Sequence, residues 1–339
     1  EKFADEVQAR FALHRESFVI DIGSNDGILL CPFKERGVRV LGIEPDKAIA
    51  QLAQKNGIET VSHFFNAEVA KKLRKKYGQA DVITATNVFA HIDDIHAVAR
   101  GVQILLKKDG VFIIEVPYLL DFLRKNLFDT VYHEHLSYFS VSSLTAFFER
   151  VGMRIVDVER VPTHGGSLRV FVRKRRFTQM QTQINPSPSW RTGRGVDEKI
   201  SDAVGEFLRR EKTLGLRKEE VYKEYAVRIH KNRAKLLTLL AGLKEKGKRI
   251  AGYGAPAKGN TLLNFFGIGT ETISFIVDKN PLKQGLFTPG THIEVFSPEK
   301  LIKDKPDYVL LLAWNFKEEI IRQQQEYKKN GGEFIEPIP

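Results

Sequence analysis

The sequence predicts an α/β protein with two separate α/β units joined by a helical connector. In residues 18–172, short apolar runs of strand length alternate with stretches of helical periodicity, as in a mostly parallel sheet covered by helices. The same alternation starts again at residue 248. Between them, residues 177–195 are rich in turn-forming residues and lack periodicity. A chain of 339 residues is long enough for two domains with buried cores.

The first unit is predicted to contain seven strands. Strands joined by helices imply parallel pairing with right-handed crossovers. The last two strands are joined by a short His-Gly-Gly turn at residues 164–166, which predicts an antiparallel pair. The predicted strands are 18–22, 38–43, 58–61, 81–86, 110–116, 154–158 and 167–172, and the predicted helices are 47–56, 94–106 and one capped by Ser142 or Ser143 that ends near Arg150.

The second half of the chain begins with a helical pattern. Apolar residues recur at helical spacing from 196 to 243, and two helices broken near Gly215 fit this length. The α/β pattern then returns, with predicted strands 248–253, 273–277 and 308–313 and a helix 316–329. We therefore expect one domain at 1–172, a basic and mostly helical connector at 173–247, and a second domain at 248–339.

The net charge of +11 is confined to the connector. Residues 1–172 are neutral overall, residues 173–249 carry 21 basic and 9 acidic side chains, and residues 250–339 have a net charge of −1. The charged run is expected to be the solvated face of the connector helices, and a role in attracting an anionic ligand is the alternative. This placement weakens the third possibility, binding to nucleic acid.

Cysteine content and hydropathy limit the class of protein. Cys31 is the only cysteine, which excludes an internal disulfide and a multi-cysteine zinc cluster in this chain and fits a cytoplasmic protein. No run approaches the roughly 20 apolar residues of a membrane helix, so no membrane partner is expected.

A glycine-containing loop follows the first predicted strand. Residues 21–27 read DIGSNDG, and Asn25 stands where the dinucleotide-binding pattern has its second glycine. Because that glycine allows close approach to a pyrophosphate, its absence favours an adenosyl ligand without phosphates. Glu44 ends the second strand and is placed to accept hydrogen bonds from ribose hydroxyls. The alternative is a structural turn without a ligand.

The following motifs resemble those of class I S-adenosylmethionine-dependent methyltransferases. The strand 81–86 is followed by residues 87–91 (NVFAH), and a leucine-containing turn with Gly110 precedes the next strand. Residues 167–172 look like the reversed seventh strand of that fold. The resemblance implies a Rossmann-like domain that binds S-adenosylmethionine. The candidate cofactor-binding residues are Asp21, Gly23, Ser24, Asn25, Glu44 and Asn87.

A cluster of titratable residues follows the fifth predicted strand. Residues 132–138 read YHEHLSY, and histidine is the side chain best matched to proton transfer at neutral pH. Two alternatives remain open, a zinc site and a merely structural cluster. No cysteine is near His133 and His135, so no metal is predicted.

The whole chain closely resembles the nucleotide-sugar C-methyltransferases of deoxysugar biosynthesis. The resemblance is carried by residues 21–27 and 132–138, by HGGSLR at 164–169, and by GYGAPAKGNT at 252–261. TPGT at 288–291 and AWN at 313–315 match as well. It implies methylation of a sugar carbon, C3, next to a 4-keto group, on a hexose carried by a nucleoside diphosphate. It also implies a second Rossmann-like domain that binds the nucleotide.

The same resemblance implies roles for individual residues. His135 matches the base that removes the C3 proton, and Tyr132 and Glu134 match residues that hold and polarise the sugar. His91 faces the same pocket in the family, although by itself it also fits a capping or core histidine. Stabilisation of an enolate requires such a base together with donors near the oxygen. His133 and Tyr138 are placed among the substrate-binding residues.

The second unit has its own candidate ligand site. Residues 254–260 form a turn that meets a helix amino terminus, where backbone N–H groups favour a diphosphate. Lys258 adds a positive charge there, and Asp278 ends the next strand, the usual place of a ribose or base contact. Fold geometry alone is the alternative. The candidate substrate-binding residues here are Gly254, Lys258, Asn260, Asp278 and Trp314.

The sequence indicates one function and leaves several alternatives open. A cysteine-rich zinc domain found at the amino terminus of the family has no counterpart among these residues, so zinc is not expected in this chain. The expected activity is C-methylation of a nucleotide-linked 4-keto-deoxyhexose. The alternatives are an N- or O-methyltransferase on a nucleotide sugar, a nucleic-acid-modifying protein, and a catalytically silent nucleotide-sugar-binding module. The oligomeric state stays open.

Overall fold

The computed structural model describes residues 1–175 and 200–338 of the chain. They form two compact units, each built from two stretches of the chain: Glu1–Leu119 with Leu136–Leu214, and Leu120–His135 with Gly215–Pro339. This division differs from the predicted segments, because residues 120–135 fold with the carboxy-terminal part of the chain. The predicted turn-rich break at 177–195 lies outside the described residues.

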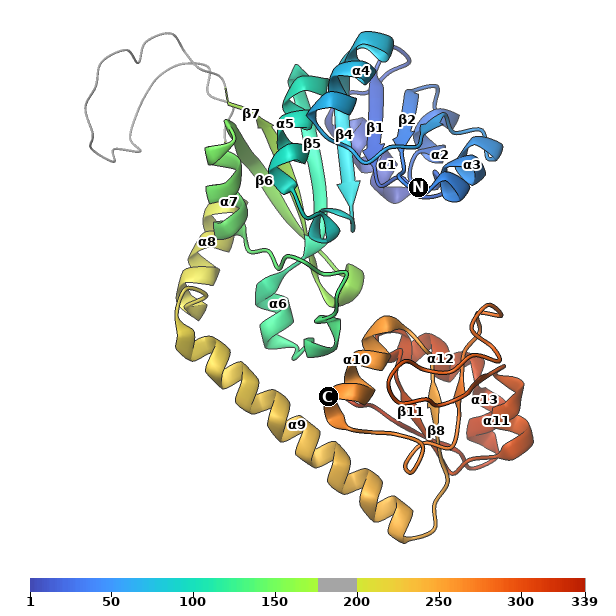
Figure 1. Cartoon of the computed structure of the whole chain (residues 1–339). Coiled ribbons are helices and arrows are strands. Elements are labelled where there is room, and N and C mark those ends of the chain that lie inside the picture. The colour runs from blue at the N-terminus through green and yellow to red at the C-terminus, as the bar shows by residue number, and fades with distance from the viewer. Residues whose placement is uncertain (176–199, 339) are drawn as a thin grey trace. The chain divides into compact units, whose positions relative to one another are not determined.

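The first unit is organised around a mixed sheet with the order β3-β2-β1-β4-β5-β7-β6 (Figure 1). The first five strands pair in parallel, and β7 runs antiparallel to both of its neighbours, which confirms the predicted antiparallel pair. The strands are β1 (Phe18–Ile22), β2 (Arg39–Ile43), β3 (Thr60–Val61), β4 (Ala80–Thr86), β5 (Leu106–Pro117), β6 (Met153–Val161) and β7 (Ser167–Lys174).

Helices cover both faces of this sheet. Apolar side chains of α1, α2 and α3 pack with Val19, Val82 and Val111 on one face, and on the other face Phe112 contacts rings of η1 and α7. The helices are α1 (Lys2–Arg10), α2 (Cys31–Glu35), α3 (Lys47–Lys55), α4 (Ala67–Tyr77), α5 (Ile95–Leu105), α7 (Val141–Arg150) and α8 (Asp202–Leu214), with short 3-10 turns η1 (Phe89–His91) and η3 (Thr163–Gly165).

Several predicted element boundaries in this unit differ from the structure, and two of these differences have a clear physical reason. Gly110 lies inside β5, where a Cβ would come within 2.9 Å of the Asp81 carbonyl, so glycine serves close strand packing rather than a turn. The helix α7 is capped by Ser140, whose side chain accepts from the Ser143 N–H in a capping box. The predicted cap Ser142 instead donates its N–H and hydroxyl to the Glu211 carboxylate.

The second unit contains a parallel sheet with the order β10-β9-β8-β11-β12 (Figure 1). Its strands are β8 (Ile250–Tyr253), β9 (Ile276–Val277), β10 (Val295–Phe296), β11 (Tyr308–Leu311) and β12 (Glu333–Ile335). Its helices are α6 (Leu119–Arg124), which starts at the border of the units, α9 (Glu219–Glu245), α10 (Ala257–Phe266), α11 (Glu299–Asp304), α12 (Lys317–Gln323) and α13 (Gln325–Lys329), with the turns η2 (Phe128–Thr130) and η4 (Trp314–Phe316). The single predicted helix at 316–329 is thus divided.

The segment 120–135 is held in the second unit by apolar and polar contacts. The ring of Phe128 stacks on Phe266 of α10, with ring centroids 4.9 Å apart, and it belongs to the core that includes Leu262 and Leu263. Arg228 of α9 donates to the Leu123 carbonyl at 2.8 Å. Segments far apart in the sequence therefore form one core here.

The predicted break between the connector helices is confirmed. The helix α8 ends at Leu214, Gly215 adopts a left-handed φ of 76°, and α9 begins at Glu219. The helix α8 contacts β6 of the first unit, whereas the apolar side of α9 belongs to the core of the second unit. Most basic side chains of both helices and of the turn between them are exposed, as expected for a solvated face: Arg209, Arg210, Lys212, Arg217, Lys218, Lys223, Arg228, Lys231, Lys235 and Lys244. Within the described residues, no helix is long and apolar enough to cross a membrane.

The buried glutamate of α8 yields a stability prediction. Glu211 is 1% exposed, and it accepts from the N–H groups of Val141 and Ser142 at 2.6 and 2.9 Å. Glu211→Ala leaves these donors without their acceptor and is expected to destabilise the first unit by about 2–4 kcal/mol. Urea denaturation with hydrogen exchange read separately for each unit measures the loss.

The control lies on the same helix. Glu206 is exposed and pairs with Arg210 one turn away, so Glu206→Ala is expected to cost less than about 0.5 kcal/mol. Equal losses in the two variants would contradict a stabilising role for the Glu211 carboxylate.

Candidate active site

The loop after β1 lies at the carboxyl edge of the first sheet. The N–H groups of Gly23 and Ser24 donate to the Ile43 carbonyl at the end of β2, at 2.8 and 3.2 Å. Gly23 has a φ of 70°, and a Cβ there would lie 2.7 Å from the Val88 side chain. Asn25 follows with a φ of 50°. Only glycine fits at position 23, and backbone rather than side chain therefore faces this edge of the sheet.

Glu44 holds the loop in place. The side chain is buried, its Oε2 accepts from the Asn25 N–H at 3.0 Å, and its Oε1 accepts from the Asp46 N–H at 3.0 Å. Each carboxylate oxygen has a second acceptor site, so the group can still accept from hydroxyls of a ligand. The predicted ligand residue therefore also has a structural role that the sequence did not indicate.

Asp21 forms the buried floor beneath this loop. It is 2% exposed, and its Oδ1 accepts from the Thr84 hydroxyl at 2.5 Å. Burial raises the pKa of Asp21 from 3.8 to about 7, the hydrogen bond from Thr84 opposes this shift, and the charge of Glu44 adds to it. The carboxyl group thus titrates near neutral pH.

Two buried polar atoms at this edge have no hydrogen-bond partner within the described residues, Ser24 Oγ and Asn87 Oδ1. Asn87 follows β4 with a φ of 58°, and its N–H donates to the Glu115 carbonyl at 2.9 Å. Buried polar atoms are rarely left unsatisfied, and at a functional site a ligand can satisfy them. Together with the glycine loop and Glu44, they fit a polar adenosyl cofactor without phosphates.

The first unit also contains His91 and Tyr138. His91 is the last residue of η1 and is exposed, which does not fit a core histidine. The N–H groups of Leu136 and Ser137 both donate to the Ala90 carbonyl, at 3.0 and 3.2 Å. The chain that follows the histidine cluster is thus attached to η1 close to His91.

The histidine cluster itself belongs to the second unit. The Nδ1 of His135 lies 2.7 Å from the Thr130 carbonyl oxygen. A carbonyl only accepts, so Nδ1 carries the proton of this hydrogen bond, and in the neutral ring the lone pair is on Nε2. The rings of His135 and Tyr132 are 4.4 Å apart. The hydrogen bond at Nδ1 thereby orientates the ring with Nε2 as its basic nitrogen.

The neighbours of His135 complete the cluster. Burial raises the pKa of the Tyr132 hydroxyl, and the charges of Glu134 and Asp129 add to this, so the hydroxyl stays protonated at neutral pH and can donate. His133 and Glu134 are exposed. The structure therefore groups Tyr132 to His135 in the second unit, whereas His91 and Tyr138 belong to the first unit.

A similar loop lies at the carboxyl edge of the second sheet. Gly254 has a φ of 87°, its N–H donates to the Val277 carbonyl at 2.7 Å, and a Cβ there would lie 2.7 Å from the Ala313 side chain. Asp278 accepts from the N–H groups of Ala255 and Asn280 at 2.7 and 2.8 Å. Lys283 lies 3.4 Å from the Asp278 carboxylate.

The first turn of α10 follows this loop and contains Lys258 and Asn260. Burial lowers the pKa of Lys258 to about 8, while the negative charge of Asp129 acts in the opposite direction. The ammonium group lies 4.5 Å from the centroid of the Trp314 ring and donates to Asn315 Oδ1. A half-buried cation at a helix amino terminus is suited to bind a phosphate group.

Trp314 and Asp129 form a contact that the sequence did not predict. The indole Nε1–H donates to Asp129 Oδ2 at 2.6 Å, so the only polar donor of the predicted ligand residue Trp314 is already used. Asp129 is 0% exposed, and burial raises its pKa. In the sequence, only its position three residues before Tyr132 indicates that Asp129 could belong to the site.

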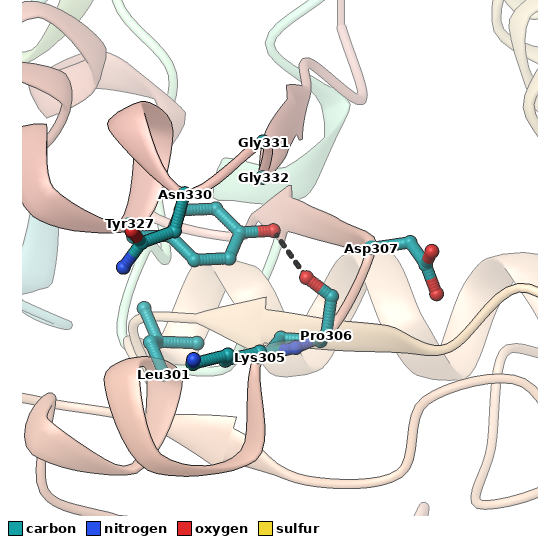
Figure 2. A pocket seen from close by; sticks show the side chains of 8 residues that line it. All are labelled: Leu301, Lys305, Pro306, Asp307, Tyr327, Asn330, Gly331 and Gly332. Carbon is teal, nitrogen blue, oxygen red and sulfur yellow. Dashed lines mark hydrogen bonds between the residues drawn. The ribbon is translucent and has the colours of Figure 1, made fainter.

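A small hollow in the second unit lies away from these residues. It is a cavity of about 90 Å³ lined by Leu301 of α11, Tyr327 of α13 and residues before β11 and β12, among them Asp307 and Gly332. Figure 2 shows the side chains around it. The hydroxyl of Tyr327 donates to the Pro306 carbonyl there, at 3.0 Å. Open parallel sheets bind ligands at the carboxyl ends of their strands, and this is the opposite edge. Elsewhere in the described residues, no group of three His, Cys, Asp or Glu side chains is arranged to hold a metal ion.

Comparisons with known proteins agree with this geometry. Residues 1–158 match the family described as a methyltransferase domain, and residues 162–339 match the family described as the C-methyltransferase C-terminal domain. The C-methyltransferase NovU of Streptomyces niveus is 41% identical over 338 residues, which cover 100% of this chain and 76% of NovU.

More distant relatives match only the first part of the chain. The ubiquinone biosynthesis O-methyltransferase of Pseudomonas aeruginosa strain UCBPP-PA14 is 26% identical over 157 residues, 41% of this chain and 66% of that enzyme. A solved structure of a SAM-dependent methyltransferase from Archaeoglobus fulgidus has 16% identity and a TM-score of 0.42, and the match covers 51% of this chain and 93% of that chain.

The chain is an S-adenosylmethionine-dependent methyltransferase of the class I fold. This follows from the strand order with the antiparallel β7, from the glycine loop after β1 and from the matched methyltransferase domain. The predicted fold class and the predicted type of enzyme are confirmed. The chain belongs to the C-methyltransferase family that has this C-terminal domain.

The raised pKa of Asp21 predicts how stability depends on pH. The unfolded carboxyl group releases its proton near pH 4, whereas the folded one keeps it until about pH 7. The folded state therefore binds more protons between these values, and the free energy of unfolding falls as pH rises, by up to about 1.4 kcal/mol per pH unit. Asp21→Asn is expected to flatten this dependence, which urea denaturation from pH 4 to 8 without cofactor measures. The exposed Asp93 provides a control, Asp93→Asn, and equal slopes in wild type and Asp21→Asn would contradict the prediction.

Proposed function

We propose that this C-methyltransferase acts on a 4-keto-deoxyhexose linked to a nucleoside diphosphate and methylates the carbon next to the ketone, C3. The observation that carries the proposal is the hydrogen bond between His135 Nδ1 and the Thr130 carbonyl. It leaves Nε2 as the basic atom of a neutral imidazole, and a C–H bond next to a ketone needs a base before carbon can accept a methyl group. The name of NovU, a C-methyltransferase, supports transfer to carbon.

The proposed cofactor site uses the residues at the carboxyl edge of the first sheet. Glu44 accepts from the ribose hydroxyls, the backbone of Gly23, Ser24 and Asn25 lies against the adenosyl group, and Asn87 contacts the methionine part. Asp21 supports the loop from below. S-adenosylmethionine, when bound there, supplies the electrophilic methyl group.

The proposed substrate site uses the second unit. Gly254 and Asn260 border the loop and helix end that receive the diphosphate, and Lys258 provides the positive charge. The pKa of about 8 means that Lys258 is mostly protonated at neutral pH, and a bound anion stabilises this charged form. Asp278 accepts from the ribose or base, and the face of Trp314 remains for apolar contact with the substrate.

The proposed reaction begins with proton transfer. His135 Nε2 removes the C3 proton, and the electron pair of the broken C–H bond is delocalised onto the ketone oxygen. Tyr132 donates a hydrogen bond to this oxygen, since its raised pKa keeps the hydroxyl protonated. Glu134 and His133, in the same unit as His135, hold and orientate the sugar hydroxyls. The substrate roles of His91 and Tyr138 rest on the family resemblance alone. The electron pair at C3 would form the new carbon–carbon bond to the methyl group as the methyl–sulfur bond breaks, with the electrons of that bond passing to the sulfur of the leaving S-adenosylhomocysteine and the C3 proton remaining on His135 Nε2.

The proposed activity also implies a partner and a cellular location. We propose a nucleotide sugar as the partner, without nucleic acid or membrane, and a cytoplasmic setting for the enzyme. Zinc is not proposed for this chain. The alternative, a zinc site at His133 and His135, is tested by a metal analysis of the purified protein.

The cofactor site can be tested without the sugar. Glu44→Gln removes the negative charge that accepts from the loop and from the ribose, and hydrogen bonds to charged groups contribute about 1.5–3 kcal/mol. The dissociation constant for S-adenosylmethionine, measured by calorimetry, is expected to rise at least about tenfold. The exposed Glu59 supplies the control Glu59→Gln, which should leave affinity unchanged. Unchanged binding in Glu44→Gln would remove Glu44 from the site.

The proton transfer is tested by solvent exchange. The substrates are 4-keto-6-deoxyhexoses linked to thymidine or uridine diphosphate, incubated in D₂O with S-adenosylhomocysteine in place of the methyl donor. The wild-type protein is expected to exchange the C3 proton, and His135→Asn to lower the exchange rate at least about 100-fold, as for loss of a general base. NMR of the sugar measures it.

The control for this experiment is His14→Asn, a change at an exposed position before β1, which is expected to exchange at the wild-type rate. Full exchange and turnover in His135→Asn would reject His135 as the base, whereas absence of C3 exchange in the wild-type protein would reject carbanion chemistry. A product with the methyl group on nitrogen or oxygen would favour the alternative methyltransferase activities instead.

A further inference from the structure

Asp129 is a buried acidic residue between the core of the second unit and the histidine cluster. It lies in η2, it is 0% exposed, and its Oδ2 accepts from Trp314 Nε1–H at 2.6 Å. Its Oδ1 is buried and has no hydrogen-bond partner within the described residues. A buried carboxylate is costly to maintain, and a half-satisfied one calls for an explanation beyond stability.

The residues beside Asp129 connect it to the proposed base. Phe128 on one side is anchored by stacking on Phe266. Thr130 on the other side provides the carbonyl that receives the His135 Nδ1–H. A shift of the peptide at Asp129 would therefore move the oxygen that orientates His135.

Trp314 connects Asp129 to the proposed anion site. The indole ring lies 4.5 Å from Lys258 Nζ, and Lys258 also donates to Asn315, the residue after Trp314. The negative charge of Asp129 favours the protonated form of Lys258. All of these residues belong to the second unit.

We propose that Asp129 is a positioning residue, which through Trp314 fixes the turn that orientates His135 and through its charge prepares Lys258 for an anionic group of the substrate. The naming of His135 as the base and of Lys258 as the anion site rests on the proposed function. The contacts of Asp129 do not, so the proposal is tested by readouts that need neither substrate nor methyl transfer.

Three variants of the full chain separate the hydrogen bond from the charge. Asp129→Ala removes both, Asp129→Asn keeps an oxygen that accepts from Trp314 but removes the charge, and Trp314→Phe removes the donor but keeps the charge and an aromatic ring. All are smaller than or similar in size to the native residue, so overpacking does not complicate the comparison.

The first readout is hydrogen exchange of the peptide that spans residues 130–136, measured by mass spectrometry. A hydrogen bond to a charged acceptor contributes about 1.5–3 kcal/mol, which corresponds to exchange about tenfold faster or more when it is lost. This increase is expected in Asp129→Ala and Trp314→Phe, and not in Asp129→Asn. The double variant of Asp129→Ala with Trp314→Phe should exchange no faster than either single variant.

The second readout is the rate at which Lys258 is acetylated as a function of pH. The neutral amine reacts, so loss of the Asp129 charge should raise the rate at pH 7 by about threefold in Asp129→Asn. Trp314→Phe retains the carboxylate and is expected to keep the wild-type profile. The exposed Lys244 in the same digest provides the reference rate.

The outcomes decide the proposal. Faster loop exchange in Trp314→Phe with an unchanged Lys258 profile, and the reverse in Asp129→Asn, support it. An unchanged loop in Trp314→Phe, an unchanged Lys258 profile in Asp129→Asn, or faster exchange throughout the second unit in all variants would overturn it. If the wild-type protein did not exchange the C3 proton but the loop and Lys258 results were as expected, the role of His135 as the base would be rejected. The positioning role of Asp129 would still stand.

Discussion

Both candidate sites depend on one kind of hydrogen bond, in which a carboxylate at the end of one strand accepts from the backbone of the loop after its neighbour. Glu44 accepts from Asn25, and Asp278 accepts from Ala255, each at 3.0 Å or less. Each acid also accepts from the N–H two residues further along the chain. Charge-assisted bonds of this kind are about twice as strong as neutral ones, so they define the loop before any ligand is present.

The same arrangement explains why each loop has a glycine. A Cβ at Gly23 would lie 2.7 Å from Val88, and a Cβ at Gly254 would lie 2.7 Å from Ala313. In both units the loop therefore packs closely on residues that follow a neighbouring strand. This strand is β4, next to β1, in the first unit and β11, next to β8, in the second. The edge of each sheet then presents backbone and an acid, which is buried at Glu44 and half-buried at Asp278. Both units thus fix the loop after their central strand with the same kind of hydrogen bond.

The sequence predicted those features that depend on local pattern. Buried strands such as β1 and the glycine at position 215 follow from hydropathy and backbone preference, and motif order identified the class I fold. Features set by distant contacts were missed. Ser140 caps α7 instead of the predicted Ser142 or Ser143, and Ser142 donates to Glu211, about 70 residues away in the sequence. Asp129 resembles an ordinary surface acid until Trp314, 185 residues later, is seen to bind it.

The division of residues between the two units separates the steps of the proposed reaction. The proposed cofactor residues belong to the first unit, whereas the base His135 and the anion site at Lys258 belong to the second. Proton abstraction therefore depends on contacts inside one compact unit, where the carbonyl of Thr130 sets the reacting nitrogen of His135. The proposed base and the proposed anion site therefore share one compact unit. This is why the hydrogen bond of Asp129 matters for the chemistry, since it joins the base to the residues that would bind the diphosphate.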